Sequence, residues 1–239
     1  MRTLVSACML ALVLSSSLAV AAARGRSKSL SFQERLRSHV AALDGTKVIP
    51  IQALVHTAFE HQLPFALEYI DRDAVKVQPQ LKLPAATVRQ RIGSLVGLVP
   101  GFRVSFANGL VDVYSPAARA DSSNLLNVVL HRFTVQHLDA GLAAHGVRDG
   151  LVAQIANEPG GFASIAGVAG PPVTIDARDI RVYEVLNRIV AEQGHSMWVV
   201  GVPPEKLSKL DGDLWHFYGL YPVFESTVVE RLLGLFPKQ

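Results

Sequence analysis

The pattern that most constrains the fold occurs twice in the chain. Residues 81–106 read LKLPAATVRQRIGSLVGLVPGFRVSF, and residues 173–200 read VTIDARDIRVYEVLNRIVAEQGHSMWVV. Both stretches pass from alternating apolar residues, through a polar joint, into apolar residues at helical spacing, and back to alternation. A period of two predicts a half-buried strand, and spacings of three and four predict an amphipathic helix. Two strand–helix–strand segments of this kind predict an α+β fold.

The two stretches share a register of apolar positions. Their helical and second-strand parts align with a constant offset of 94 residues, and the strands before them with an offset of 92. The aligned pairs are Val88 and Val182, Ile92 and Leu186, Leu95 and Ile189, Val96 and Val190, Val104 and Trp198, and Phe106 and Val200. We expect Ile92 and Leu186 to be fully buried. Because spacing matches rather than identity, the pattern indicates either a duplication or two independent strand–helix–strand segments.

We predict an α+β fold of two βαβ-type units with small mixed sheets backed by helices, preceded by an N-terminal helix. The predicted segments are a signal peptide at 1–23, a basic segment and helix at 24–49, a first unit at 50–115, a linker at 116–126, a second unit at 127–225, and a C-terminal helix or tail at 226–239. A chain of this length accommodates one large domain or two small ones.

Local patterns add three details. Apolar spacing predicts that the N-terminal helix runs over residues 29–43. Asn108-Gly109, between two alternating segments, predicts a tight β-hairpin. Residues 138–156 have helical spacing but contain several glycines, each costing about 1 kcal/mol relative to alanine, so we expect the helix to break near Gly146.

The first 23 residues have the three-part pattern of a secretory signal peptide. Arg2 precedes an apolar run at 4–14, and small residues at 21–23 predict cleavage before Arg24. An uncleaved anchor is the alternative, although the run is shorter than the roughly 20 residues that span a bilayer. Acylation at Cys8 is another, although the apolar core mostly follows that residue. Since Cys8 is the only cysteine, the mature chain would hold no disulfide.

Charge excludes one class of partner. The formal net charge is +3, and the basic residues cluster at RGRSKS, residues 24–29. This cluster predicts a solvated N-terminus or a patch that touches anionic lipid or cell-wall polymer. Elsewhere the signs are mixed, so we expect no nucleic-acid partner.

Both repeated stretches resemble the secretin and TonB short N-terminal domain, a small periplasmic βαβ module of outer-membrane secretins and some TonB-dependent receptors. The resemblance covers residues 50–115 and 127–202 and rests on the helix pattern VxxxLxxIVxxxG. The second copy carries Val182, Leu186, Ile189, Val190 and Gly194 at these positions, and the first carries Val88, Ile92, Leu95 and Val96. The first copy departs from the pattern with Pro100 in place of the glycine. The resemblance implies an envelope protein that works through protein–protein contact rather than catalysis.

No motif predicts a catalytic, cofactor or metal site. His56 and His61 are five residues apart in a predicted helix, which places them on different faces, whereas a shared metal requires a spacing of three or four. The glycine-rich segment 160–170 lacks the ending of a phosphate loop, and no G-x-S-x-G motif occurs. We therefore expect no catalytic residues, no cofactor and no bound metal.

Two apolar segments are candidate partner-binding surfaces. Segment 160–170 would expose Phe162, Ile165 and Val168, unless it is only a connector. Segment 214–221 contains Trp215, Phe217 and Tyr218 and no charged residue, so it is either an edge strand open to a partner or a strand paired inside the fold. Core packing is the alternative for its aromatic side chains.

The predicted function follows from these patterns together. We expect an exported protein, periplasmic or outer-membrane associated, that acts as a non-catalytic binding or assembly module for envelope proteins. Once the signal peptide is removed, we expect no transmembrane segment. One alternative is a carbohydrate- or peptide-binding protein that uses the C-terminal aromatic residues, and another is a hydrolase whose site the sequence does not reveal.

Overall fold

The structure is a computed structural model, and it describes residues 30–47, 50–68, 80–122, 124–156, 170–194, 196–200 and 218–222. The chain divides into two units, Met1–Ser31 and Phe32–Gln239. Every helix and strand given below belongs to the second unit. The predicted signal peptide, with Cys8 and the cleavage point before Arg24, lies outside the described residues.

The predicted α+β class is confirmed. The described helices are α2 (Phe32–Arg37), α3 (Pro50–Glu60), α5 (Val88–Val96), α6 (Pro116–Ala120), α7 (Ala140–Ala156) and α8 (Val182–Gln193), with a 3₁₀ turn at Leu125–Asn127. The described strands are β1 (His39–Val40), β2 (Leu43–Lys47), β3 (Phe65–Leu67), β4 (Gln80–Leu83), β5 (Ala86–Thr87), β6 (Arg103–Ala107), β7 (Leu110–Tyr114), β8 (Val129–Leu138), β9 (Val173–Arg181), β10 (Ser196–Val200) and β11 (Tyr218–Pro222).

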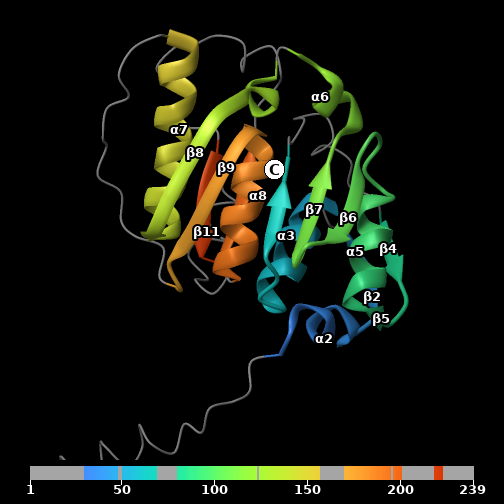
Figure 1. Cartoon of the computed structure of the whole chain (residues 1–239). Helices are drawn as coiled ribbons and strands as arrows, with labels where there is room; N and C mark the ends of the chain where they lie inside the picture. The colour runs from blue at the N-terminus through green and yellow to red at the C-terminus, as the bar shows by residue number, and fades with distance from the viewer. Residues whose placement is uncertain are drawn as a thin grey trace, which may run out of the picture. The chain divides into compact units, whose positions relative to one another are not determined.

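The largest sheet has the strand order β11-β10-β3-β7-β6 (Figure 1). Its three central strands are parallel, with β10 and β7 on either side of β3, and the two outer strands are antiparallel to their neighbours. Strands β3, β6 and β7 come from the first expected unit, and β10 and β11 from the second. Both expected units therefore contribute to one common sheet.

Alternation along the central strands builds two apolar clusters, one on each face of this sheet. In β3, Phe65 and Leu67 join the cluster formed with α3 and α5, whereas Ala66 joins the cluster formed with α7, α8, β8 and β9. Helices α5 and α8, the two helices of the repeated pattern, thus pack into different clusters (Figure 1). Ile92 and Leu186 are both fully buried, as predicted.

The predicted N-terminal helix at 29–43 is wrong in its extent, because α2 ends at Arg37. The carbonyl of Ser38 accepts a hydrogen bond from the Val88 amide, and the Ser38 hydroxyl donates to the carbonyl of Arg35. These bonds end the helix and turn the chain into an extended segment. Strands β1 and β2 of this segment then pair with β5 and β4, and the ladder is interrupted opposite Pro84, which has no N–H to donate.

The predicted helix break near Gly146 is also wrong, because α7 is continuous from Ala140 to Ala156. A side-chain Cβ on Gly146 would lie 3.6 Å from the ring of Phe133, and one on Gly150 would lie 3.8 Å from Leu130. These are ordinary van der Waals distances, so alanine would fit at either position, and it is the packing of α7 against β8 that offsets the low helix propensity of the glycines. The hairpin at Asn108 and Gly109 is confirmed, with positive φ angles of 53° and 75° at the corner.

Candidate functional site

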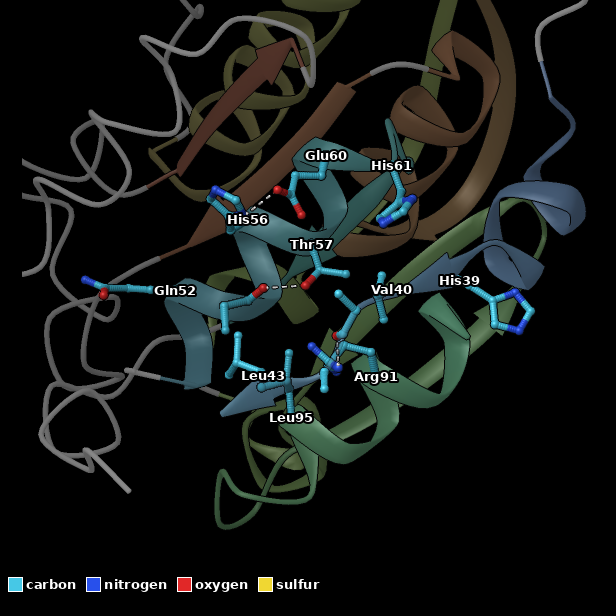
Figure 2. Close-up of a pocket in the computed structure, with 13 residues that line it drawn as sticks. His39, Val40, Leu43, Gln52, His56, Thr57, Glu60, His61, Arg91 and Leu95 are labelled. Carbon is cyan, nitrogen blue, oxygen red and sulfur yellow. Dashed lines mark hydrogen bonds and ion pairs between the residues drawn. The ribbon is translucent and has the colours of Figure 1, made fainter. Parts of the chain in front are cut away.

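A groove with a volume of about 490 Å³ lies between helix α3, helix α5 and the extended segment that follows α2 (Figure 2). The lining residues are His39, Val40, Ala41, Ala42, Leu43, Gln52, Ala53, His56, Thr57, Glu60, His61, Arg91 and Leu95. They form two walls and a floor, each of which comes from a different part of the sequence.

The first wall is the 39–43 segment, all five residues of which line the groove. Successive side chains of an extended chain point to opposite sides, so the lining by five consecutive residues indicates that the backbone of this segment borders the groove together with its side chains. Strands β1 and β2, at the two ends of this segment, pair with β5 and β4 on one edge. Within the described part of the chain, no strand pairs with their other edge.

The second wall is one stripe of α3, with Gln52, Ala53, His56, Thr57 and Glu60 at helical spacing. The Thr57 hydroxyl donates to the carbonyl of Ala53 at 2.7 Å, so it is satisfied within the helix. The imidazole Nδ1 of His56 lies 3.5 Å from a carboxylate oxygen of Glu60, and both side chains are more than half exposed. This wall therefore has a buried polar middle and a charged, solvated rim.

His61 also lines the groove, and it lies just beyond helix α3, in which the sequence had placed it together with His56. The reason is that α3 ends at Glu60 and Gln62 adopts a positive φ of 50°, which places His61 in a turn. Its Nδ1 lies 3.2 Å from the hydroxyl of Ser38. Burial lowers the pKa of His61, while the neighbouring Glu60 acts in the opposite direction.

The floor consists of Leu95 and Arg91, which are 1% and 6% exposed. Nη2 of Arg91 donates to the main-chain carbonyls of Ala41 at 2.7 Å and Pro84 at 3.0 Å. Among the described residues, no carboxylate forms an ion pair with this guanidinium. A largely buried positive charge therefore borders the groove with only neutral partners, an arrangement that is costly unless an anion joins it.

A second buried arginine has a different environment. Arg119 of α6 donates from Nε to the carboxylate of Glu68, and from Nη2 to both oxygens of Asp112 at 2.8 and 2.9 Å. Its guanidinium also stacks on the rings of Tyr114 and Tyr183, at 3.8 and 4.3 Å from their centroids. The charge of the guanidinium is therefore compensated inside the fold, and two aromatic rings contact the group.

Amide side chains complete this polar cluster. Asn124 approaches Glu68 at 3.5 Å, and Asn187 of α8 donates to Asp112 at 3.3 Å. The indole N–H of Trp198 in β10 donates to the amide oxygen of Asn187 at 2.8 Å. The cluster thus connects β3, β7 and α6 to α8 and β10, and none of its residues lines the groove.

Charge in the cluster is unbalanced, since two carboxyl groups share one guanidinium. Burial raises the pKa of Glu68 and of Asp112, although Arg119 opposes this effect for both. The two carboxylates in turn raise the pKa of Arg119 despite its burial. The arginine therefore stays charged, and the carboxyl groups hold a proton to a higher pH than usual.

The residues predicted to bind a partner lie mostly outside the described part of the chain. These residues are Phe162, Ile165, Val168, Trp215 and Phe217. Tyr218 is the first residue of β11, where its backbone pairs with Val200 of β10. Residues 218–222 are thus paired inside the fold along one edge, and a role for these six residues in partner binding stays a prediction. Among the described residues, no three or more histidine, cysteine or acidic side chains group as a metal site would need.

Sequence reasoning missed Arg91, although a signal for it is present. Val88, Arg91, Ile92 and Leu95 follow one another at the spacing of a single helix face, and all four are buried. A charged residue on an apolar stripe marks either an internal ion pair or a ligand site. Asp112, between two valines of β7, gives the same signal in a strand.

Comparison of the chain with models of protein families, with curated proteins and with solved structures finds no match. The resemblance to the secretin and TonB short N-terminal domain stays a prediction. In the part of the chain that the structure describes, no helix combines the length and apolarity needed to cross a bilayer.

Proposed function

We propose that this protein is a non-catalytic binding module of the bacterial envelope, and that it holds an extended segment of a partner protein in the groove. The observation that carries the proposal is the 39–43 segment, whose five residues all line a cavity opposite helix α3, and whose strands β1 and β2 have no described partner on their second edge. An open edge of N–H and C=O groups is a template for another strand. A helix opposite that edge adds side-chain contacts on the second flank of the bound segment.

The dimensions of the groove support this ligand class. An extended chain rises about 3.3 Å per residue, so the five residues from His39 to Leu43 offer roughly 15 Å of edge. The volume of about 490 Å³ lies in the range of specific ligand sites. A segment of four or five residues therefore suits the groove, while a folded domain would contact only its exposed rim.

Selection from a displayed library of random nine-residue peptides tests this proposal, with the folded protein immobilised. We expect enrichment of related sequences on the wild type and loss of that enrichment with Ala42→Trp, which fills the groove from an exposed position. Ala107→Trp is the matched control, because Ala107 is also exposed, lies in β6 and does not line the groove. Equal enrichment on wild type and Ala42→Trp would show that the groove is not the binding site.

The envelope location rests on the predicted signal peptide. If the protein is exported as proposed, the mature form in an envelope fraction begins at Arg24. N-terminal sequencing of that fraction provides the measurement. A chain that begins at Met1, or at an acylated Cys8, would contradict this part of the proposal.

Hydrolysis is a second candidate function, favoured by one contact beside the groove. The hydroxyl of Ser38 lies 3.2 Å from Nδ1 of His61, the distance of a nucleophile and its base. However, the same hydroxyl donates its proton to the carbonyl of Arg35 at 2.6 Å. We therefore expect a fluorophosphonate probe to leave the wild-type protein unlabelled. Labelling that disappears with Ser38→Ala would favour the hydrolase instead.

A further inference from the structure

We infer that the groove selects segments that carry an acidic side chain, and that Arg91 binds the carboxylate of this side chain. This inference rests on the proposed function and adds the chemistry of the partner to it. Arg91 is 6% exposed and lines the groove, and within the described chain its partners are two main-chain carbonyls. Carbonyls satisfy hydrogen bonds but carry no net charge, so the positive charge stays uncompensated until an anion enters.

The donors that remain on the guanidinium indicate how an anion would be bound. Both carbonyls are bound by Nη2, at 2.7 and 3.0 Å. A guanidinium has five N–H donors in a planar fork, so Nη1 and Nε still present donors beyond those carbonyls. Figure 2 shows this side chain reaching from α5 toward the space between α3 and the 39–43 segment. Both bidentate faces of a guanidinium include Nη2, so the remaining donors offer single N–H···O bonds rather than a parallel pair. A carboxylate is the anionic group that ordinary protein side chains carry, and one of its oxygens can accept such a bond while its charge compensates Arg91.

The position of Arg91 indicates where the acid lies in the bound segment. Its nearest carbonyl partner belongs to Ala41, the middle residue of the 39–43 segment. A segment bound along residues 39–43 would therefore bring its central part, rather than its end, closest to the guanidinium, while the carbonyl of Ala41 stays occupied by Arg91. We conclude that the carboxylate belongs to an aspartate or glutamate inside the segment rather than to a free C-terminus.

The rest of the lining predicts the neighbours of that acid. Val40, Leu43 and Leu95 are partly or fully buried apolar residues around Arg91. Residues two positions apart in a strand share a face, so small aliphatic residues are expected on both sides of the acid at that spacing. Glu60 is the negative group of the lining, and it lies on the exposed rim beside His56. It therefore opposes a second acidic residue near that rim.

The test uses the peptides enriched by selection on the wild-type protein. We expect them to share one acidic residue, and we expect its replacement by the matching amide to weaken binding at least roughly tenfold in fluorescence anisotropy. On Arg91→Gln the acidic and amide peptides should bind alike. Arg89→Gln is the matched control, since this substitution removes the same charge from the same helix. Arg89 itself is exposed and lies over the ring of Phe106, 4.4 Å from its centroid.

Each remaining outcome decides one of the two proposals. Enrichment of related peptides that lack an acidic residue overturns this inference and leaves the proposed function standing. A requirement for a free C-terminus, lost when the peptide is amidated, overturns it as well. Absence of any groove-dependent enrichment removes the proposed function itself.

A measurement on the wild type alone covers the case in which Arg91→Gln does not fold. The enriched peptide is labelled with ¹³C at its acidic carboxyl group, and this carboxyl is titrated by NMR in the free and the bound peptide. Contact with Arg91 should lower the pKa of the carboxyl in the complex. An unchanged or raised pKa in the bound peptide would overturn the inference.

Discussion

Arg91 and Arg119 are both largely buried, yet their partners differ in charge. Arg119 contacts the carboxylates of Glu68 and Asp112, and two tyrosine rings cover its guanidinium. Arg91 contacts two main-chain carbonyls and borders an open groove. A buried cation requires a counter-charge. The fold supplies two carboxylates to Arg119, whereas no described carboxylate forms an ion pair with Arg91. The comparison separates an arginine that holds the fold together from one that is available to a ligand.

The two arginines also join different parts of the molecule. The Arg119 cluster connects the end of β3 and the middle of β7 to α6, and through Asn187 and Trp198 to α8 and β10. It thereby ties together the two halves of the central sheet. Arg91 connects α5 to the 39–43 segment and to the carbonyl of Pro84. It positions one wall of the groove, and its loss should disturb that wall more than the sheet.

The largest expected effect comes from removing the compensated arginine. Arg119→Met leaves two buried carboxyl groups without their cation, which should lower the free energy of unfolding by about 3–5 kcal/mol at pH 7. The loss should shrink near pH 4, where the carboxyl groups are protonated. Urea unfolding at both pH values measures the difference. A loss below about 1 kcal/mol at pH 7, the level of exposed ion pairs, would contradict the structural role of this cluster.

An apolar substitution in the core shows how the loss of unfolding free energy depends on pH when no charged group is removed. Leu186→Ala empties a fully buried site in α8 and should cost about 2–5 kcal/mol. Because the deleted atoms are apolar and carry no charge, the loss in unfolding free energy should be the same at pH 4 and pH 7. A denaturant midpoint that barely moves would show that this face of α8 is not packed as described. A cost that varies with pH as strongly as that of Arg119→Met would remove the distinction between the two variants.

The excess carboxylate in the Arg119 cluster predicts a pH dependence of stability. Burial raises the pKa of Glu68 above its usual 4.5, so the folded state holds the proton more tightly than the unfolded state does. The resulting stabilisation is fully present below about pH 4.5 and is lost as the pH rises through the raised value. Glu68→Gln removes this titration and should stay within about 1 kcal/mol of the wild type at pH 8, since lost attraction and relieved desolvation oppose each other.

The measurement compares the unfolding free energies of wild type and Glu68→Gln at pH 5 and pH 8. The wild type should lose more stability over this interval, because titrating groups that do not interact with Glu68 cancel in the comparison. An equal or steeper loss in Glu68→Gln would mean that Glu68 is ionised throughout and fully compensated by Arg119.

The sequence predicted the parts of this fold that depend on short-range spacing. Apolar periodicity located α5 and α8 and the burial of Ile92 and Leu186, and Asn108-Gly109 located a hairpin. The predicted break in α7 is wrong because the packing of α7 against β8 keeps the helix continuous, and sequence spacing does not reveal that packing. The predicted end of the N-terminal helix is wrong for the same kind of reason. The hydrogen bond from the Val88 amide to the Ser38 carbonyl joins residues that lie far apart in the sequence.

The candidate site was beyond sequence reasoning for a related reason. The groove brings together residues 39–43, one stripe of α3 and two residues of α5, and none of these segments has a motif of its own. Arg91 was visible as a charge on an apolar stripe, but Asp112 was equally visible as a charge inside an apolar strand. The sequence cannot tell which of them has a partner inside the fold. That distinction depends on two facts of the tertiary structure. Arg119 forms an ion pair with Asp112, and no described carboxylate forms one with Arg91.

The smallest expected effect comes from the arginine at the groove, and it tests the comparison most directly. Arg91→Gln retains an amide that can donate to one carbonyl, and Ala41 is exposed, so water can satisfy its carbonyl group. The loss in unfolding free energy should therefore be no more than about 1 kcal/mol, the net contribution of an ordinary hydrogen bond. Urea unfolding at pH 7, with Arg89→Gln as the exposed control, measures it. A loss of about 3–5 kcal/mol, equal to that expected for Arg119→Met, would mean that Arg91 is compensated inside the fold after all. The groove would then offer no unmatched charge to a partner.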